Sequence, residues 1–303
     1  MCNPQAGNGR VQRRWPEIER LLLTSGITIE SALTSSPGEA TKMVVRAIER
    51  GFRYILGIGG DGTNNEIING ILQQRQVPSI EITYALLPIG TCNDWARTHG
   101  LPHRLKPFLK MLLDDHCIHQ DVGWVSCEQE GKEVRRFFAN VAGLAYDAHV
   151  VRETARTNSH LPGKLRYIHM ALKSFVNFRP ERARVLYDDQ QIEEYFYLIN
   201  VGICRYSGGG MQLVPHARFD DGQLAVTLAA ELGPRDIILN LPSIYRGTLA
   251  NHPRILTFHT KDIRIDAADD KPVYVEIDGE FIGHTPVEIG VVKKALRLRI
   301  PRS

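Results

Sequence analysis

The residues best suited to chemistry lie in the stretch Gly59-Gly60-Asp61-Gly62-Thr63, which ends an apolar run and precedes a helical pattern. Glycines lack a Cβ, so backbone N–H groups can approach a phosphate chain closely while the following helix presents its positive end. Asp61 places a carboxylate among these donors, where it would repel phosphate unless it holds Mg²⁺ or accepts a proton. The acid therefore favours phosphoryl transfer over simple nucleotide storage.

Other glycine patterns have to be considered for this loop. Gly57, Gly59 and Gly62 fit the dinucleotide pattern G-x-G-x-x-G, with Glu81 near the distance of a ribose contact, but this match alone is weak. A Walker loop is excluded, because the chain contains no G-x-x-x-x-G-K-[ST]. A plain glycine turn between a strand and a helix remains an alternative.

The elements that position this loop follow from the spacing of apolar residues. Residues 54–58 predict a strand and 64–72 a helix, and the next buried strand, 82–87, ends in a second glycine turn, Pro88-Ile89-Gly90-Thr91. Further helices are expected at 15–23, 41–50 and 105–113, and a short strand at 31–34. Two glycine turns at the carboxyl ends of parallel strands define a ligand crevice in an open α/β sheet.

The pattern of apolar residues changes near Gly123, where we expect the first of two domains to end. Asp121, just before this boundary, is expected to face the cleft between the two domains. Short alternating runs dominate the second half and are typical of an antiparallel sandwich: 137–142, 183–187, 195–201, 224–229, 263–265, 273–277 and 296–300. The clearest helix there is 163–178, which is amphipathic and basic. It fits either a helix packed on a sheet or one lying on an anionic membrane.

Composition limits the partners. A net charge of +3 over 303 residues argues against a dedicated nucleic-acid binder and permits attraction to phosphates or anionic lipid. The five cysteines show no C-x-x-C spacing, which suggests neither a disulfide frame nor a zinc site and fits the cytoplasm. No apolar stretch approaches the roughly 20 residues that span a bilayer, so a lipid substrate would be met peripherally, at the membrane surface.

Two segments of the chain together resemble the diacylglycerol kinase catalytic-domain family. One is the first glycine motif with Asn65-Glu66, and the other is Pro88-Ile89-Gly90-Thr91-Cys92-Asn93-Asp94-Trp95-Ala96-Arg97. The first motif is shared with NAD kinases and phosphofructokinases. The second motif fits the lipid kinases better and narrows the choice to them. The resemblance implies a Rossmann-like α/β domain over residues 1–123 plus about 294–303, and a β-sandwich lipid-substrate domain over 124–293. It places the active site between them and implies transfer of the γ-phosphoryl group of ATP, with Mg²⁺, to a lipid hydroxyl such as that of diacylglycerol.

The resemblance also assigns residues. Its catalytic residues are Glu280, Asp278 and Asp61, of which the first two would draw the proton from the hydroxyl. Including the cleft-facing Asp121, the expected ATP-binding residues are Asn3, Thr34, Gly59, Gly60, Asp61, Gly62, Thr63, Asn65, Glu66, Thr91, Asp94, Arg97 and Asp121. A structural Mg²⁺ would be held by the side chain of Asp221 and the carbonyl oxygens of Arg218 and Gln223.

Simpler structural roles stay open for several of these residues. Thr34 also fits a helix-capping loop. Asp94 and Arg97 also fit an i, i+3 surface pair, worth only about 0.2–0.5 kcal/mol. Asp221 also fits an Asp-Gly hairpin turn without a metal.

The chain departs from the family pattern at its start. Only Met1 and Cys2 precede Asn3-Pro4, where the family has an apolar strand, so we expect the native start to lie upstream; at Asn8 the family often has a basic residue, whose charge Arg10 could supply. Two rival functions remain, an NAD-kinase-like nucleotide kinase and a catalytically silent lipid-binding regulator. An exposed sandwich edge could also form a homodimer.

Overall fold

The structure is a computed structural model and describes residues 1–157, 170, 173–174, 178–230, 232 and 234–302. The chain forms two compact units, of which one comprises Met1–Gln120 with Lys294–Ser303 and the other Asp121–Lys293. Two long strands, β3 (Cys117–Gln129) and β12 (Glu280–Arg299), run from one unit into the other.

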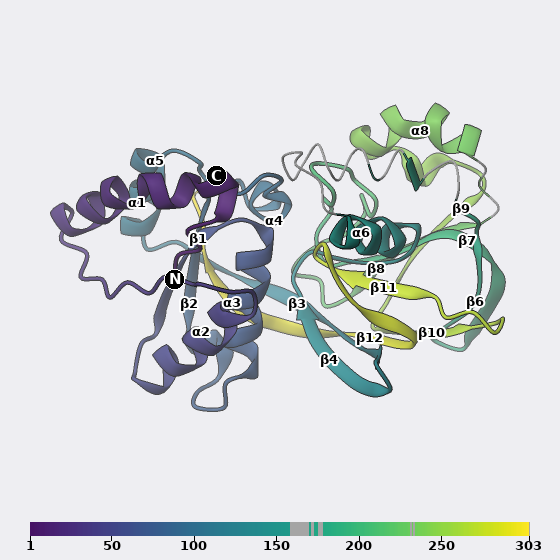
Figure 1. Ribbon diagram of the computed structural model, residues 1–303, viewed down its shortest axis with the longest axis horizontal. Coiled ribbons are helices and arrows are strands. Elements are labelled where there is room, and N and C mark those ends of the chain that lie inside the picture. The colour runs from purple at the N-terminus through teal and green to yellow at the C-terminus, as the bar shows by residue number, and fades with distance from the viewer. Residues whose placement is uncertain (158–169, 171–172, 175–177, 231, 233, 303) are drawn as a thin grey trace. The chain divides into compact units, whose positions relative to one another are not determined.

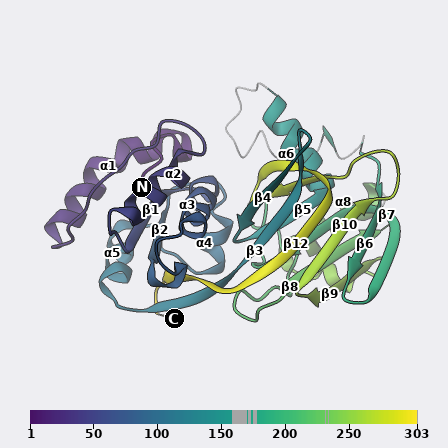
Figure 2. The ribbon, with the colours of Figure 1, turned by 90° about the horizontal axis from the view of Figure 1, so that it is seen from below.

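The N-terminal unit is built on parallel strands. Strand β1 (Tyr54–Gly59) pairs in parallel with β2 (Thr83–Pro88), which pairs in parallel with the C-terminal end of β12. Every residue of β2 is buried, as expected for a parallel strand that is covered on both faces. Helices lie on both sides of these strands (Figures 1 and 2): α1 (Ala6–Thr24), α2 (Glu39–Glu49), α3 (Asp61–Gln73), α4 (Asp94–Thr98) and α5 (Leu105–Leu113).

Most predictions for this unit are confirmed, and two need correction. The predicted helix 105–113 is α5, with the same bounds, and the strand at 54–58 is β1. Helix α3 begins at Asp61, so the last three residues of the expected loop already form its first turn. No strand forms at 31–34: Leu33 makes an isolated parallel bridge to Cys2, which also bridges Ile58.

The C-terminal unit is an antiparallel sandwich. Its strands follow the order β12-β10-β6-β7-β5-β11, and β11 pairs again with β12, so the order closes on itself, while β8 and β9 extend from β7. Helix α6 (Tyr146–Arg156) packs against β5, β11 and β7 (Figure 1). The remaining elements are β4 (Lys132–Phe138), β5 (Val141–Ala145), β6 (Glu181–Tyr187), β7 (Gln190–Gly202), β8 (Leu224–Ala230), α8 (Pro234–Arg246), β9 (Ile255–Thr260), β10 (Asp262–Ala267) and β11 (Tyr274–Ile277).

Strand predictions in this unit differ from the structure in two respects. The run 137–142 is not one strand, because β4 ends at Phe138 and β5 begins at Val141. Strands β3 and β9 were not expected. The amphipathic helix expected at 163–178 lies almost entirely outside the described residues.

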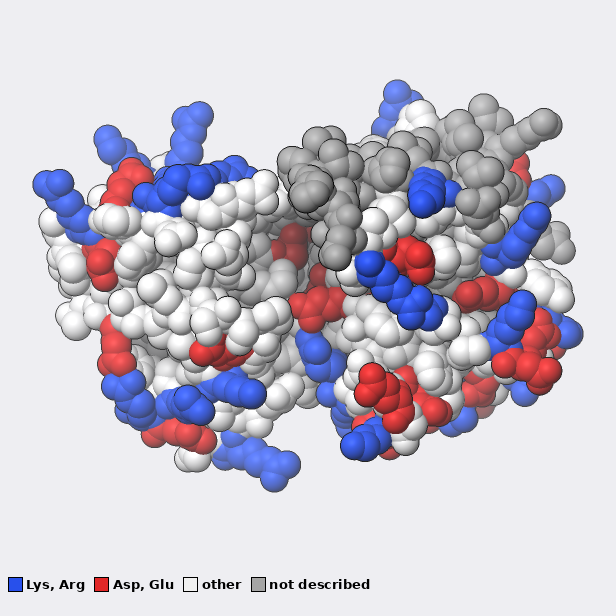
Figure 3. Space-filling view, in the orientation of Figure 1, with Lys and Arg blue, Asp and Glu red and all other residues white. Residues whose placement is uncertain are grey.

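The surface agrees with the mild net charge. Acidic and basic side chains are interspersed on the face shown in Figure 3, which therefore offers no broad patch of a single sign. Among the helices that the structure describes, none is both long and apolar enough to cross a bilayer.

Candidate active site

The first glycine loop is the junction of β1 and α3. A Cβ on Gly59 would lie 2.5 Å from the hydroxyl oxygen of Thr63, so only glycine lets the strand turn so tightly into the helix. Asp61 is the first residue of α3, where the positive end of the helix favours a carboxylate. The predicted residues Gly60 to Thr63 therefore form one short backbone surface at a helix N-terminus.

The second glycine loop follows β2 and touches the first. Asn93, at φ 52°, holds this loop by accepting a hydrogen bond from the backbone N–H of Gly90 (3.0 Å) and donating one to its carbonyl oxygen (3.2 Å). Its own backbone N–H donates to Asp61 Oδ2 (2.7 Å). A Cβ on Gly60 would lie only 2.9 Å from the Cα of Gly90. The two loops are thus packed backbone against backbone.

A third segment, at the start of the chain, closes on both loops. Asn3 Nδ2 donates to the hydroxyl oxygen of Thr63 (3.2 Å), and a Cβ on Gly7 would lie 2.6 Å from the carbonyl oxygen of Ile89. Residues 7–9 of this segment form a left-handed turn, with φ of 60°, 58° and 75°. Arg10 Nε donates to the carbonyl of Gly7 (2.9 Å), which keeps a guanidinium beside the glycines.

These three segments fit the phosphate chain of a nucleotide with its cation. They bring together backbone that a Cβ would fill, the N-terminus of a thirteen-residue helix, one carboxylate and one guanidinium. Phosphate oxygens are bound by N–H groups at helix N-termini and by arginine, and Mg²⁺ takes carboxylate and phosphate oxygens. Asp61 is the residue here that could hold Mg²⁺.

Other predicted ATP-binding residues are engaged elsewhere. Both carboxylate oxygens of Glu66 accept backbone hydrogen bonds at the start of α2, from Gly38 (2.8 Å) and Ala40 (3.0 Å), so Glu66 caps that helix. Asn65 is fully buried and accepts a hydrogen bond from the side chain of Asn69. The Thr34 hydroxyl donates to the carbonyl oxygen of Cys2 (3.4 Å). In this structure the three side chains therefore make structural contacts within the N-terminal unit.

The remaining residues of the second motif lie on or beside α4. Thr91 is exposed, whereas Asp94 is buried and forms an ion pair with Arg97 (3.7 Å), the i, i+3 pair that the spacing allowed. The buried side chain of Trp95 anchors helix α4 in the core, because its Nε1 donates a hydrogen bond to Gln120 Oε1 (3.0 Å). The half-exposed guanidinium of Arg97 thus lies on a short helix that is anchored in the core.

In the C-terminal unit, Asp278-Gly279 is a tight turn between β11 and β12, with φ of 50° and 86°. Both oxygens of the Asp278 carboxylate accept backbone hydrogen bonds, at 3.0 to 3.1 Å, from Ala139, Asn140 and Val141. This explains why the predicted strand 137–142 is interrupted. Asp278 anchors the turn, and Glu280 is the carboxylate that the turn presents.

Glu280 forms an ion pair with Arg136 of β4, whose Nη2 donates to Glu280 Oε2 (3.0 Å). About a third of each side chain is exposed, so the pair is open to solvent. The role of Arg136 could not be predicted from the sequence, because its partner is 144 residues away and no local spacing signals the contact.

Asp121 and Asp221 lie at one loop of the C-terminal unit. Asp121 Oδ2 accepts the N–H of Gly222 (2.6 Å), and Asp221 Oδ1 accepts the N–H of Gln223 (3.0 Å). Lys293 Nζ lies 2.8 Å from the position of a Cβ on Gly222, so an ammonium group already neighbours the loop. These hydrogen bonds do not involve the carbonyl oxygens of Arg218 or Gln223, so the structural Mg²⁺ expected at Asp221, Arg218 and Gln223 stays a prediction from the resemblance. No cluster of three or more possible metal-ligating His, Cys, Asp or Glu side chains occurs in the described part of the chain.

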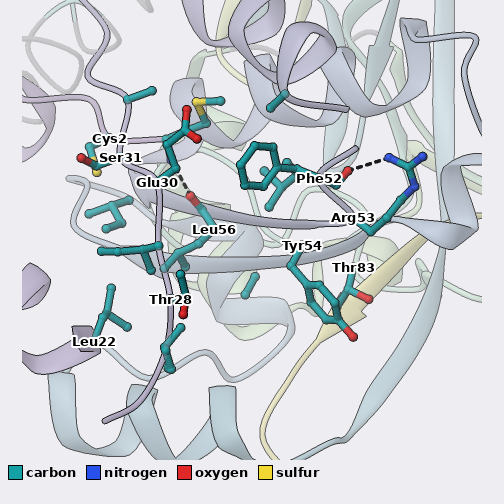
Figure 4. Close-up of a pocket in the computed structure, with 18 of the residues that line it drawn as sticks. Cys2, Leu22, Thr28, Glu30, Ser31, Phe52, Arg53, Tyr54, Leu56 and Thr83 are labelled. Atoms are coloured by element: carbon teal, nitrogen blue, oxygen red, sulfur yellow. Dashed lines mark hydrogen bonds between the residues drawn. The ribbon is translucent and has the colours of Figure 1, made fainter. Parts of the chain in front are cut away.

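A cavity of about 850 Å³ in the N-terminal unit does not coincide with these residues. It lies beside β1 and is lined largely by apolar side chains, among them Leu22, Phe52 and Leu56 (Figure 4). None of the predicted site residues lines it. We therefore place the candidate phosphate site at the glycine loops, where the polar groups converge.

Comparison with known proteins agrees with this geometry. Residues 1–125 match the model of the diacylglycerol kinase catalytic domain, and residues 140–300 match the YegS C-terminal NAD kinase beta sandwich-like domain. Diacylglycerol kinases of Staphylococcus haemolyticus and Staphylococcus carnosus are similar to this chain, with 28% and 27% identity over 302 residues; the alignments cover 99% of this chain and 87% and 94% of theirs.

Solved structures show the same architecture. A crystal structure from Bacillus anthracis, provisionally described as a diacylglycerol kinase, matches with a TM-score of 0.78 at 25% identity, covering 99% of this chain and 95% of that one. A second diacylglycerol kinase structure from this organism matches in fold, with a TM-score of 0.70 at 22% identity and the same coverage. The chain, with both domain models matched in order along it, belongs to the diacylglycerol kinase catalytic-domain family.

Proposed function

We propose that this protein transfers the γ-phosphoryl group of ATP to the hydroxyl group of a lipid. The observation that carries the proposal is the contact between the glycine loops at Gly60 and Gly90, with Asp61 hydrogen-bonded across them. Backbone packed this closely leaves N–H groups, rather than side chains, to face a phosphate chain. The names of the relatives support diacylglycerol as an acceptor.

In the proposed mechanism, the N-terminal unit holds the nucleotide. The loops and Arg10 bind phosphate oxygens, and Asp61 would hold Mg²⁺, which would neutralise charge on the phosphates. Phosphoryl transfer needs little covalent chemistry from the protein, so positioning and charge stabilisation supply most of the rate. The packed glycine loops provide that positioning.

In the C-terminal unit, Glu280 is the base that accepts the proton of the lipid hydroxyl. A positioned base contributes about 10²–10⁴-fold to a rate. Asp278 acts through position: its three backbone hydrogen bonds fix the turn that presents Glu280. Arg136 holds the Glu280 side chain in place until the acceptor binds.

The proposal is tested by incubating the purified protein with Mg²⁺ and ATP labelled in the γ-phosphoryl group. One reaction contains vesicles with diacylglycerol and another contains NAD. We expect chloroform-soluble label in the first reaction, and about 10²–10⁴-fold less from a Glu280→Gln variant. Label in NADP would instead identify a nucleotide kinase, and vesicle binding without transfer to lipid would identify a silent lipid-binding protein.

A further inference from the structure

A second carboxyl group holds the turn that presents Glu280. Glu276 Oε2 accepts a hydrogen bond from the backbone N–H of Gly279 (2.7 Å), the residue directly before Glu280. Gly279 has a φ of 86°, and glycine has the widest choice of backbone conformations of any residue. The geometry of the turn just before Glu280 therefore depends on hydrogen bonds that hold this glycine in one conformation.

A β-bulge separates the tip of this hairpin from the rest of its ladder. Val275 pairs with Gly283, but the next residue, Glu276, pairs with Phe281, so β12 carries one extra residue there. Beyond the bulge, β11 and β12 share only that pair and the pair of Ile277 with Glu280. Because a bulge disrupts the ladder locally, side-chain contacts at the turn contribute to where Glu280 points.

The Glu276 side chain is enclosed by its neighbours. It is 3% exposed, and a Cβ on Gly143 of β5, its paired residue, would lie 2.6 Å from Glu276 Oε1. The same Cβ would lie 2.9 Å from the Cβ of Asp147, a buried residue in the first turn of α6. The absence of a side chain at Gly143 thus gives Glu276 the room that it fills, and the packing leaves it little freedom to move away from Gly279.

The Glu276 carboxyl favours its uncharged form. Burial, and after it the charge of Asp147, raises the pKa of Glu276 well above its usual value, while the Gly279 hydrogen bond opposes the rise. An uncharged carboxyl still offers an acceptor oxygen to the Gly279 N–H and adds no negative charge next to Glu280. Glutamine is also uncharged, has nearly the same shape and keeps that acceptor oxygen, so it should be able to replace the acid here.

Resting on the function proposed above, we propose that Glu276 is a positioning residue for Glu280. It holds the Gly279 N–H, while Asp278 holds the N–H groups of residues 139–141. Without Glu276, the Gly279 N–H loses its acceptor and the turn relaxes. Glu280 then leaves the position from which it takes the proton of the lipid hydroxyl, so Glu276 acts on the reaction only through Glu280.

The test compares Glu276→Leu with Glu276→Gln, using diacylglycerol in mixed micelles with ATP and Mg²⁺. A misplacement of about 1 Å can cost about 100-fold in rate, so we expect kcat of the leucine variant to fall about tenfold or more. Its KM for ATP should stay unchanged, because the proposed nucleotide site lies in the N-terminal unit. The glutamine variant should keep kcat within about threefold of the wild type, since it keeps the acceptor. A wild-type kcat in Glu276→Leu, or an equal loss in Glu276→Gln, would overturn the proposal.

Thr285→Val is the matched control for a merely structural effect. Thr285 of β12 is buried, and its hydroxyl oxygen accepts the backbone N–H of Val273 (3.1 Å), just before the start of β11. Glu276→Leu and Thr285→Val thus each remove the acceptor of one backbone N–H in the same hairpin. Both should lower the urea midpoint of unfolding, but only Glu276→Leu should lower kcat. Equal losses of kcat, measured where both variants are folded, would reduce Glu276 to a structural role and refute the proposal.

A double variant tests whether Glu276 acts through Glu280. In a Glu280→Gln background the base is already absent, so adding Glu276→Leu should change the residual kcat by less than about twofold. A further loss as large as that of Glu276→Leu alone would show that Glu276 acts independently of Glu280, which contradicts the proposal.

A measurement without turnover separates this inference from the proposed function. If the wild type transfers no phosphate to diacylglycerol, the function fails, and the turn is then examined by NMR of protein labelled with ¹⁵N-glycine. Hydrogen exchange at the Gly279 amide should be faster in Glu276→Leu than in the wild type, Glu276→Gln or Thr285→Val. Unchanged exchange in Glu276→Leu would refute the holding role of Glu276, whatever the activity of the protein.

Discussion

Replacing Gly60 by alanine tests whether the packed glycine loops hold ATP. The new Cβ would lie 2.9 Å from the Cα of Gly90, whereas non-bonded carbons prefer about 3.5–4.0 Å, so the loops must separate by about 0.6 Å or more. Overpacking of this kind costs about 1–3 kcal/mol of unfolding free energy. Loops that are moved apart lose at least one N–H hydrogen bond to a charged phosphate oxygen, which is worth about 1.5–3 kcal/mol, so we expect ATP affinity to fall about tenfold or more.

Gly70→Ala is the matched control. Its Cβ would lie 2.7 Å from the Cβ of Val44 and 2.8 Å from the carbonyl oxygen of Thr41, which is a similar overlap in the same unit, on the face of α3 that meets α2. The better helix propensity of alanine offsets the cost by about 1 kcal/mol. The unfolding free energy of this variant should be equal to or lower than that of the wild type. Its affinity for ATP should be unchanged.

The assay combines calorimetry with a non-hydrolysable ATP analogue and Mg²⁺, and urea unfolding of each variant. The prediction is a loss of affinity confined to Gly60→Ala, measured under conditions where all variants are folded. Equal loss in both variants would show that affinity merely follows stability. Normal affinity in Gly60→Ala would remove the loops from the nucleotide site.

Three further predictions follow from the C-terminal unit. Glu280→Gln should lower lipid-dependent turnover about 10²–10⁴-fold and change stability by less than about 1 kcal/mol, since its ion pair with Arg136 is partly exposed; near-normal turnover would remove Glu280 as the base. Asp278→Ala leaves three backbone N–H groups without their acceptor and should cost about 3 kcal/mol or more in urea unfolding; a cost under about 0.5 kcal/mol would contradict its anchoring role. Burial raises the pKa of Asp147 from 3.8 to about 6 in the folded protein, so the unfolded chain releases this proton at a lower pH. The unfolding free energy should therefore be highest below about pH 4 and fall by up to about 3 kcal/mol as the pH rises through 6. Asp147→Asn should flatten unfolding free energy over that window, and an unchanged slope would refute this.

Much of the N-terminal unit could be predicted from local sequence. Strand β1 and helix α5 follow directly from apolar spacing, and the glycines next to Asp61 mark the loop that now contacts Gly90. That contact joins the ends of two parallel strands, whose neighbouring positions the α/β pattern implies.

The C-terminal unit was harder to predict because its decisive contacts are distant in sequence. The break between β4 and β5 is made by Asp278, more than a hundred residues later, which takes the amides of residues 139–141. Strand register likewise places the buried Glu276 beside Gly143, which is more than a hundred residues earlier in the chain. A single sequence shows the residue types but not their pairing.

The central claim is that this chain moves the γ-phosphoryl group of ATP onto a lipid oxygen. The most direct measurement uses ATP whose γ-phosphoryl carries heavy oxygen at its non-bridging positions, with mass spectrometry of the extracted lipids. The account predicts a phosphorylated lipid that carries all of the heavy oxygens and whose yield falls sharply in Gly60→Ala and Glu280→Gln. Heavy oxygen found only in inorganic phosphate, with every lipid at its original mass, would contradict it.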